Sequence, residues 1–163
     1  MRREKHRKAC HYRTECLQEA GRITCPVEIV RLEDESFHLL IEVEVDGVGG
    51  DMIIDTGASV TVVDQRLFPG EADGRLNTEM QSGSVTGQIK NIRLLRPKSF
   101  KLHVHPVRHP QMATIDLNYV NDMYHKHIRR RIIGLLGSDF CVKHKAVINY
   151  RTKEFSINRP RKK

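Results

Sequence analysis

A strict alternation of apolar and acidic side chains runs through residues 41–46. This pattern is typical of a β-strand with one buried face. Asp46-Gly47, with Gly49-Gly50 after it, favours a tight turn, and apolar residues 52–54 follow that turn. The sequence therefore predicts an antiparallel hairpin whose second strand delivers Asp55 at its end.

Short apolar runs bounded by turn residues continue along the rest of the chain. They predict further strands in residues 27–32, 60–63, 100–104, 132–137, 147–150 and 154–157, and short helices in residues 116–127 and 138–143. We expect Val27 and Ile29 to share one face of the strand in residues 27–32. In the strand in residues 100–104 we expect Phe100, Leu102 and Val104 to be buried. No strands alternate with long helices, so the fold class is mostly β and mostly antiparallel.

The net charge of +8 lies in the two ends of the chain. Residues 1–25 and residues 159–163 each carry a net +4, and residues 26–158 are formally neutral. We expect a basic N-terminal extension (1–25) with a helix in residues 3–20, one folded domain (26–158) and a basic tail (159–163). A nucleic-acid-binding face on the domain is therefore not expected, although the tails could contact polyanions weakly.

The apolar runs are short. Residues 39–41 and 132–136 fall far below the ~18 residues of a membrane-spanning helix, so no membrane segment is expected. No apolar stretch of signal-peptide length follows the N-terminus, which predicts a cytoplasmic location.

Cysteine and histidine spacings do not match a common metal site. The four cysteines form no Cys-x-x-Cys pair, so free thiols and no metal or cofactor are expected. The alternative is a zinc site in the N-terminal extension. The remaining histidines, like residues 129–131, are interpreted as solvated surface groups. The residues concerned are His6, Cys10, His11, Cys16, Cys25, Cys141, His103, His105, His109, His125, His127, Arg129, Arg130 and Arg131.

The segment Asp55-Thr56-Gly57-Ala58-Ser59 follows a buried strand. A carboxylate at such a place needs hydrogen bonds, and Gly57 lets backbone amides approach it. Asp-Thr-Gly alone is equally typical of a plain turn. About eighty residues later the chain reads Leu135-Leu136-Gly137, followed by a Ser-Asp pair at the start of a predicted helix.

With these two segments the sequence resembles the retropepsin-like aspartic proteases, in particular bacterial cytoplasmic members, over about residues 37–157. The resemblance implies a closed, antiparallel, barrel-like acid protease fold. It implies a catalytic segment Asp55, Thr56 and Gly57, supported by Ala58, Ser59 and a ψ-shaped loop at Leu135, Leu136 and Gly137. It also implies a flap over the substrate, for which Gly83, Ser84, Val85, Thr86 and Gly87 are the candidates; an ordinary loop is the alternative there.

The sequence has one Asp-Thr-Gly and no second copy of this motif. Aspartic proteolysis uses two carboxylates that share a proton. The resemblance therefore implies a homodimer in which Asp55 of each chain supplies half of the dyad and Thr56 braces the turn.

The expected function is an aspartic endopeptidase that acts on a peptide or protein substrate. Serine-hydrolase and P-loop signatures are absent from the sequence. Two alternatives remain: a non-catalytic interaction module with the same fold, and a nucleic-acid-associated protein that binds through its basic tails.

Overall fold

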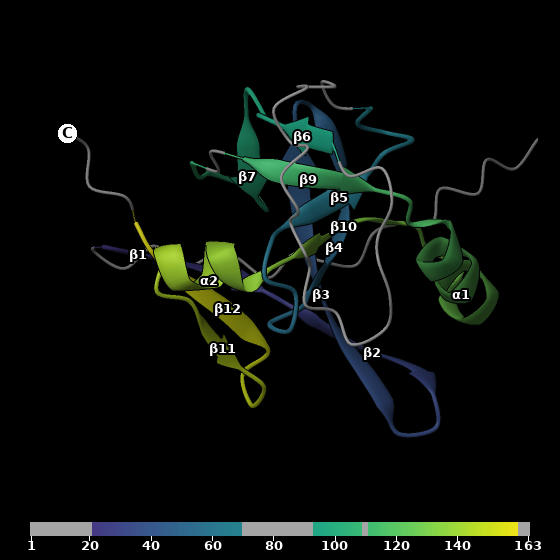
Figure 1. Ribbon diagram of the computed structural model, residues 1–163. Helices are drawn as coiled ribbons and strands as arrows, with labels where there is room; N and C mark the ends of the chain where they lie inside the picture. Colours follow the sequence, from purple (N-terminus) through teal and green to yellow (C-terminus); the bar gives the residue numbers. More distant parts are fainter. Residues whose placement is uncertain (1–20, 70–92, 109–110, 160–163) are drawn as a thin grey trace, which may run out of the picture.

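The computed structural model describes residues 21–69, 93–108 and 111–159, which form two sheets and two helices (Figure 1). The smaller sheet is antiparallel, with the strand order β1-β12-β11. Its strands are β1 (Arg22–Pro26), β11 (Val147–Asn149) and β12 (Glu154–Asn158). Residues 22–25, which the sequence analysis assigned to the N-terminal extension, are thus paired with the last strand.

The larger sheet curls into a half-barrel (Figure 1). Its order is β6-β9-β5-β10-β4-β3-β7-β8, and β2 pairs with β3 beside this path. The strands are β2 (Glu28–Glu33), β3 (Ser36–Val45), β4 (Val48–Ile54), β5 (Val62–Asp64), β6 (Arg93–Leu95), β7 (Phe100–Leu102), β8 (His105–Pro106), β9 (Met112–Ile115) and β10 (Ile132–Leu136). Only β10–β4 and β5–β9 are parallel pairs among the described strands, so the mostly β, mostly antiparallel expectation is confirmed.

The predicted hairpin is β3 and β4. Asp46 and Gly47 both have positive φ (48° and 83°), and Val45 pairs with Val48 across this two-residue turn. The alternating apolar residues of β3 point into the core, where Val43 and Val45 are at most 1% exposed. The local pattern therefore determines both the turn and the buried face.

The main core lies between the two sheets and beneath helix α2 (Ser138–Lys143). Phe140 of α2 packs on Phe155 of β12 with ring centroids 6.5 Å apart. Figure 1 shows α2 beside the smaller sheet. The helix predicted in residues 138–143 is present, and Gly137, rather than a side-chain cap, is its N-cap residue.

Helix α1 (Asn118–Ile128) covers the opposite face of the larger sheet. Tyr124 is fully buried against apolar residues of β2, β3, β4 and β10, and its hydroxyl is hydrogen-bonded to His38 Nδ1 at 2.5 Å. The helix ends at Arg129, which adopts the left-handed conformation. The expected helix in residues 116–127 is confirmed with small shifts of its ends.

One expected face is wrong. Val104 is 65% exposed and His105 is buried, because the chain turns at His103 with φ 52° and breaks the alternation that begins at Phe100. Val27 and Ile29 do share a face, which packs in the main core, but Val30 on the other face is also buried, because α1 covers that side.

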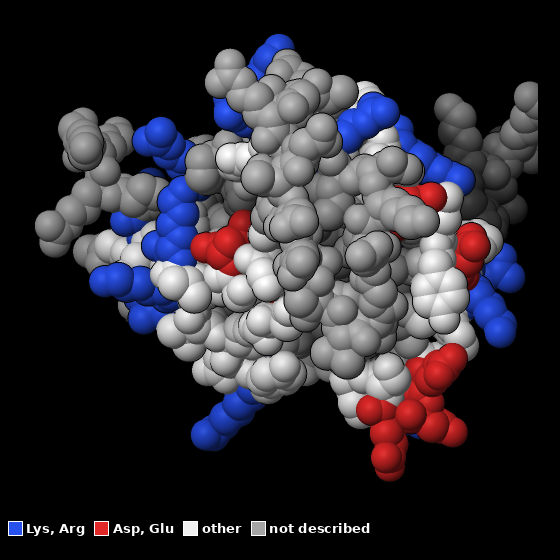
Figure 2. All heavy atoms as spheres, in the orientation of Figure 1, with Lys and Arg blue, Asp and Glu red and all other residues white. Residues whose placement is uncertain are grey.

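Figure 2 shows acidic side chains gathered at the lower right, where Figure 1 places the tip of the β2–β3 hairpin. The tip carries Glu33, Asp34 and Glu35. Basic side chains are distributed around the edge of the same face. The helix expected in residues 3–20 and residues 160–163 of the tail lie outside the described residues. Of the helices in the described ranges, none has the length and apolar character needed to cross a membrane.

Candidate active site

Asp55 follows the last residue of β4 and is attached to β10. Ile54 pairs in parallel with Leu136, and the Asp55 amide then donates to the Leu136 carbonyl at 3.0 Å. The end of β4 and the end of β10 therefore lie side by side. The acid that the sequence analysis selected is held at the point where these two strands separate.

The turn after β4 is built around the Asp55 carboxylate. The Gly57 amide donates to Oδ1 at 2.9 Å, the Ala58 amide approaches the same oxygen at 3.3 Å, and Ala58 also donates to the Asp55 carbonyl at 3.2 Å. A Cβ at position 57 would lie 3.2 Å from Oδ1, so a glycine suits this approach. Within the described residues Oδ2 has no hydrogen-bond partner.

β10 passes between β4 and β5 and brings residues 135–137 under this turn. Leu135 pairs with Ile53 on one side and with Val62 on the other. Gly137 then passes so close to the Asp55 turn that a Cβ there would lie 2.7 Å from the Val60 carbonyl carbon and 2.9 Å from the Ala58 carbonyl oxygen. The structure thus brings together the two segments, 55–59 and 135–137, that the sequence analysis linked.

A polar network joins the turn to α2, and sequence reasoning missed it. Asp139 Oδ1 accepts hydrogen bonds from the Thr61 amide (2.9 Å), the Thr61 hydroxyl (2.7 Å) and the Phe140 amide (2.7 Å). The Thr61 oxygen in turn accepts from the Gly137 amide at 3.0 Å. The available signal was a hydroxyl inside the apolar run Val60 to Val63, together with an acid two residues after Gly137.

Ser138 also binds the start of α2 to the Asp55 turn. Its amide and its hydroxyl both donate to the Ala58 carbonyl, at 2.8 and 3.0 Å. Asp139, which was expected to cap the helix, instead binds across to Thr61 as well as to its own helix. The Asp55 turn is therefore anchored to the start of α2 by Ser138 and Asp139.

The face of the turn away from this network is open. Thr56, Gly57 and Ser59 are exposed and Asp55 is half-buried. Two cavities, of about 350 and 380 Å³, lie elsewhere and are not lined by Asp55. One of the two is lined by residues of segments 97–101 and 106–108. The flap candidates, residues 83–87, lie outside the described residues.

The cysteines and histidines of the described part do not assemble a metal site. In these ranges no group of three or more His, Cys, Asp and Glu side chains could hold a metal ion. Cys25 is buried, and Cys141 is a half-buried free thiol. Burial, with the Asp139 charge as a further cause, raises the pKa of the Cys141 thiol, which makes it a poor nucleophile.

The basic segment 129–131 differs from its interpretation as solvated groups. Arg130 forms ion pairs with Glu28 and Asp51, the latter at 2.5 Å, and Arg131 pairs with Asp64 at 3.0 Å. Arg131 stays exposed in spite of its ion pair, with 53% of its side chain open to solvent, and Arg129 is exposed at the end of α1. Single-sequence reasoning had no signal for these pairs, because each acid lies more than sixty residues away along the chain.

Comparison with solved structures gives low identities. The retropepsin-like aspartic protease from Rickettsia conorii is 17% identical, with a TM-score of 0.46, over 90% of this chain and 96% of that chain. The retroviral protease-like domain of Ddi1 from Leishmania major is 13% identical, with a TM-score of 0.48, over 76% of this chain and 90% of that chain. No curated protein matches the sequence.

A family model described as aspartyl protease matches residues 41–140. The match contains the Asp55 turn, the segment 135–137 that supports it, and Asp139. Since it spans more than half of the sequence, this chain belongs to the aspartyl protease family.

Proposed function

We propose that the chain is an aspartic endopeptidase in which Asp55 supplies one of two catalytic carboxylates and a second copy of the chain supplies the other. The observation that carries the proposal is the state of the Asp55 carboxylate. One oxygen is fixed by the amides of Gly57 and Ala58, and the other has no partner among the described residues. An acid held in this way is positioned for use and not consumed by a structural ion pair.

The chemistry requires a second acid close to the first. One carboxylate, ionised, accepts a proton from the attacking water, while the other, protonated, donates a hydrogen bond to the carbonyl of the scissile peptide bond. Two carboxylates at such a distance share a proton because both cannot ionise easily. Since the sequence contains one Asp-Thr-Gly, two-fold symmetry is the simplest source of the partner acid.

The exposure of the turn supports a site completed by another chain. Thr56 and Gly57 are open to solvent, so a second copy could approach Asp55 from this side. In the proposal Thr56 braces the partner's turn, and residues 83–87 fold over the bound peptide as a flap. Both roles remain proposals for this chain.

The first test is Asp55→Asn, which keeps the size of the side chain and its hydrogen bonds to Gly57 and Ala58 but removes the charge. Incubation with a peptide library from acidic to neutral pH should show cleavage by the wild type and none above background by the variant. Asp122→Asn, at an exposed position of α1, is the matched control and should cleave normally. Cleavage retained in folded Asp55→Asn would refute the catalytic assignment.

A mixing experiment tests the second copy. With a threefold excess of Asp55→Asn chains, random pairing leaves about one quarter of the wild-type chains in wild-type dimers, so cleavage per wild-type chain should fall to about one quarter. The shared dyad would be contradicted if cleavage per wild-type chain stays unchanged in the mixture and if sedimentation shows that the protein is a monomer. A folded dimer without any cleavage would instead favour a non-catalytic interaction module.

We further propose peptide or protein substrates and a cytoplasmic location. The free thiol of Cys141 supports a reducing environment. Fractionation of cells that express the tagged chain tests the location, and recovery with exported proteins would contradict it.

A further inference from the structure

β10 lacks the sequence pattern that normally sets the register of a strand. All five of its residues are apolar or glycine, and its buried side chains enter two different cores: Ile132 under α1, Ile133 and Leu136 in the main core. Alternation of apolar and polar residues fixes register in most strands, because a slip by one residue would expose the wrong face. A continuous apolar strand buried on both faces carries no such alternation, so its register depends on other contacts. One of them is Gly134, where a Cβ would lie 2.3 Å from the Val62 carbonyl oxygen.

The register of β10 matters for the Asp55 site. A slip of one residue would move the Leu136 carbonyl by about 3.3 Å along the strand. It would break the 3.0 Å hydrogen bond from the Asp55 amide and remove the Gly137 amide from the Thr61 hydroxyl. Whatever holds β10 in place therefore also holds the catalytic turn.

The first polar anchor of β10 is Asn121, in α1. Its side-chain amide pairs with both backbone groups of Ile132: Nδ2 donates to the Ile132 carbonyl at 3.1 Å, and the Ile132 amide donates to Oδ1 at 2.7 Å. Ile132 is fully buried and is the first residue of β10. This double hydrogen bond fixes where the strand begins relative to α1.

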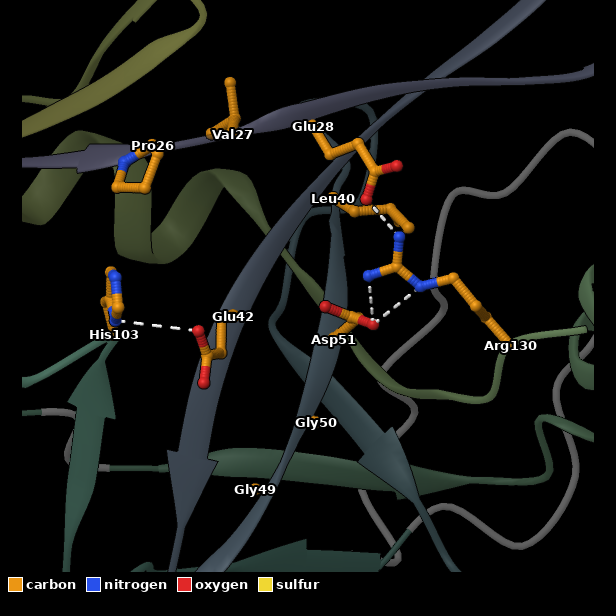
Figure 3. A pocket seen from close by; sticks show the side chains of 10 residues that line it. All are labelled: Pro26, Val27, Glu28, Leu40, Glu42, Gly49, Gly50, Asp51, His103 and Arg130. Atoms are coloured by element: carbon orange, nitrogen blue, oxygen red, sulfur yellow. Dashed lines mark hydrogen bonds and ion pairs between the residues drawn. The ribbon is translucent and has the colours of Figure 1, made fainter. Parts of the chain in front are cut away.

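The second anchor is Arg130, which reaches the β4 side (Figure 3). Its Nε and Nη2 atoms donate to Asp51 Oδ2 at 3.1 and 2.5 Å, and Nη1 donates to Glu28 of β2. Asp51 is the β4 residue that pairs with Ile132 in the parallel register. The pairing is irregular between Ile132 and Gly134, so the arginine holds the strand just ahead of a bulge.

The third anchor is Arg131, which reaches the opposite side. Its Nη2 donates at 3.0 Å to Oδ2 of Asp64, the last residue of β5, whose side chain is 1% exposed. Asn121 Nδ2 lies 3.5 Å from the same oxygen. A buried carboxylate is costly without a cation and hydrogen bonds, so Asp64 favours this contact, although the Arg131 side chain itself is 53% exposed.

We propose that Asn121, Arg130 and Arg131 form a register lock on β10 and are positioning residues for Asp55, acting through Leu136 and Gly137. Two adjacent arginines hold the strand from its two neighbours, and the asparagine fixes its first residue. The lock lies on the opposite end of β10 from the catalytic turn and does not touch substrate. The expected effect on kcat rests on the proposed protease function, whereas the expected effect on the position of Asp55 does not.

The test uses Asn121→Ala, with Asp122→Ala as the matched control at the next, exposed position of α1. Amide hydrogen exchange should accelerate by roughly tenfold or more at Asp55 and Gly137 in Asn121→Ala, while the amides of β1 and β12 keep wild-type rates. The kcat for peptide cleavage should fall by roughly ten- to a hundredfold, with KM changed less than twofold, because misplacement of a catalytic group lowers kcat. The control should change neither.

A rescue pair separates positioning from general stability. Arg131→Gln leaves Asp64 as a buried, unpaired charge, and the double variant Arg131→Gln with Asp64→Asn restores a neutral amide pair at the same place. The double variant should regain most of the kcat and the slow Asp55 amide exchange that Arg131→Gln loses. If Asn121→Ala does not fold, this comparison of the Arg131→Gln single and double variants replaces it as the test. Wild-type exchange rates at Asp55 and Gly137 in folded Asn121→Ala would overturn the lock. If the wild type cleaves no peptide, the proposed function fails while the exchange rates still decide the lock.

Discussion

The carboxylate of Asp139 accepts hydrogen bonds from both the amide and the hydroxyl of Thr61, at 2.9 and 2.7 Å. The same hydroxyl oxygen accepts the Gly137 amide at 3.0 Å. Thr61 is fully buried, so its two polar groups depend on these partners. This pair therefore connects α2, the end of β10 and the segment that follows the Asp55 turn.

Replacement of Thr61 by valine should destabilise the protein by about 1–3 kcal/mol, since the Gly137 amide and Asp139 lose a buried partner while the side-chain shape is kept. Urea denaturation measures the free energy of unfolding. Thr61→Ser, which retains the hydroxyl and removes one methyl group, is the matched control and should keep the hydrogen bonds. Equal losses in the two variants would show that the methyl group, and not the hydroxyl, stabilises this site.

Gly137→Ala should be destabilising because the new methyl group meets backbone atoms that cannot rotate away. Its Cβ would lie 2.7 to 2.9 Å from atoms of Val60, Thr61 and Ala58. We expect a loss of about 1–3 kcal/mol and faster hydrogen exchange at Asp55. Gly49→Ala is the control, because the nearest atom there is the Val43 carbonyl oxygen at 3.9 Å; its stability should change by less than about 0.5 kcal/mol. Similar stabilities of the two variants would contradict the close packing.

Local patterns predicted much of this fold. The alternation in β3 and the Asp46-Gly47 turn are properties of neighbouring residues, so a single sequence was enough to place the hairpin and to end its second strand just before Asp55. The link between the Asp55 turn and residues 135–137 came from a resemblance and agrees with the β4–β10 pairing. The catalytic role of these residues stays a prediction.

Contacts between distant segments could not be predicted. The parallel pairing of β10 with β4 and the ion pairs of Arg130 and Arg131 join residues far apart in the chain, for which composition and periodicity carry no signal. Arginines in a run are usually solvated, and only the fold shows that two of these three face acids. The Thr61–Asp139 pair also joins distant segments, and its one local sign was the hydroxyl inside the apolar run Val60 to Val63.

His144 should make the protein less stable as the pH falls below neutral. Burial is the main cause that lowers the pKa of His144, which is 6% exposed and packs on Phe140 with ring centroids 4.3 Å apart. Its Nε2 donates to the Arg108 carbonyl. The unfolded chain, with the ordinary value of 6.5, binds the proton first. The free energy of unfolding therefore falls as the pH drops below 6.5, and this loss is complete below the lowered pKa.

His144→Gln keeps a side-chain donor and removes the titration. Urea denaturation at several pH values from 8 to 5 should show a shallower loss of stability in the variant than in the wild type. At pH 8 the histidine is neutral in both the folded and the unfolded state, so the difference measured there is the control for packing alone. Parallel curves over the whole range would show that His144 does not contribute to the pH dependence.

Arg130→Met should raise the pKa of Asp51 further. Burial raises the pKa of this carboxyl, Arg130 opposes the rise, and the charges of Glu28 and Glu42 add to it. Arg130 lies between Asp51 and Glu28, so its removal leaves these two acids facing each other without a cation (Figure 3). A carbon-13 NMR titration of the Asp51 carboxyl should give a higher midpoint than in the wild type. Lys101→Met, which removes the partner of Glu44 on the same sheet, is the control and should move this midpoint little.

The stability of Arg130→Met follows from the same shift. The folded state of the variant holds a proton on Asp51 at a pH where the unfolded chain, with the ordinary value of 3.8, has released it. The free energy of unfolding lost through the substitution is therefore largest near neutral pH and shrinks as the pH falls through the raised pKa. Urea denaturation at pH 7.5 and pH 5 measures both values. A deficit that grows on acidification would show that Arg130 acts on this site by a route other than neutralising Asp51.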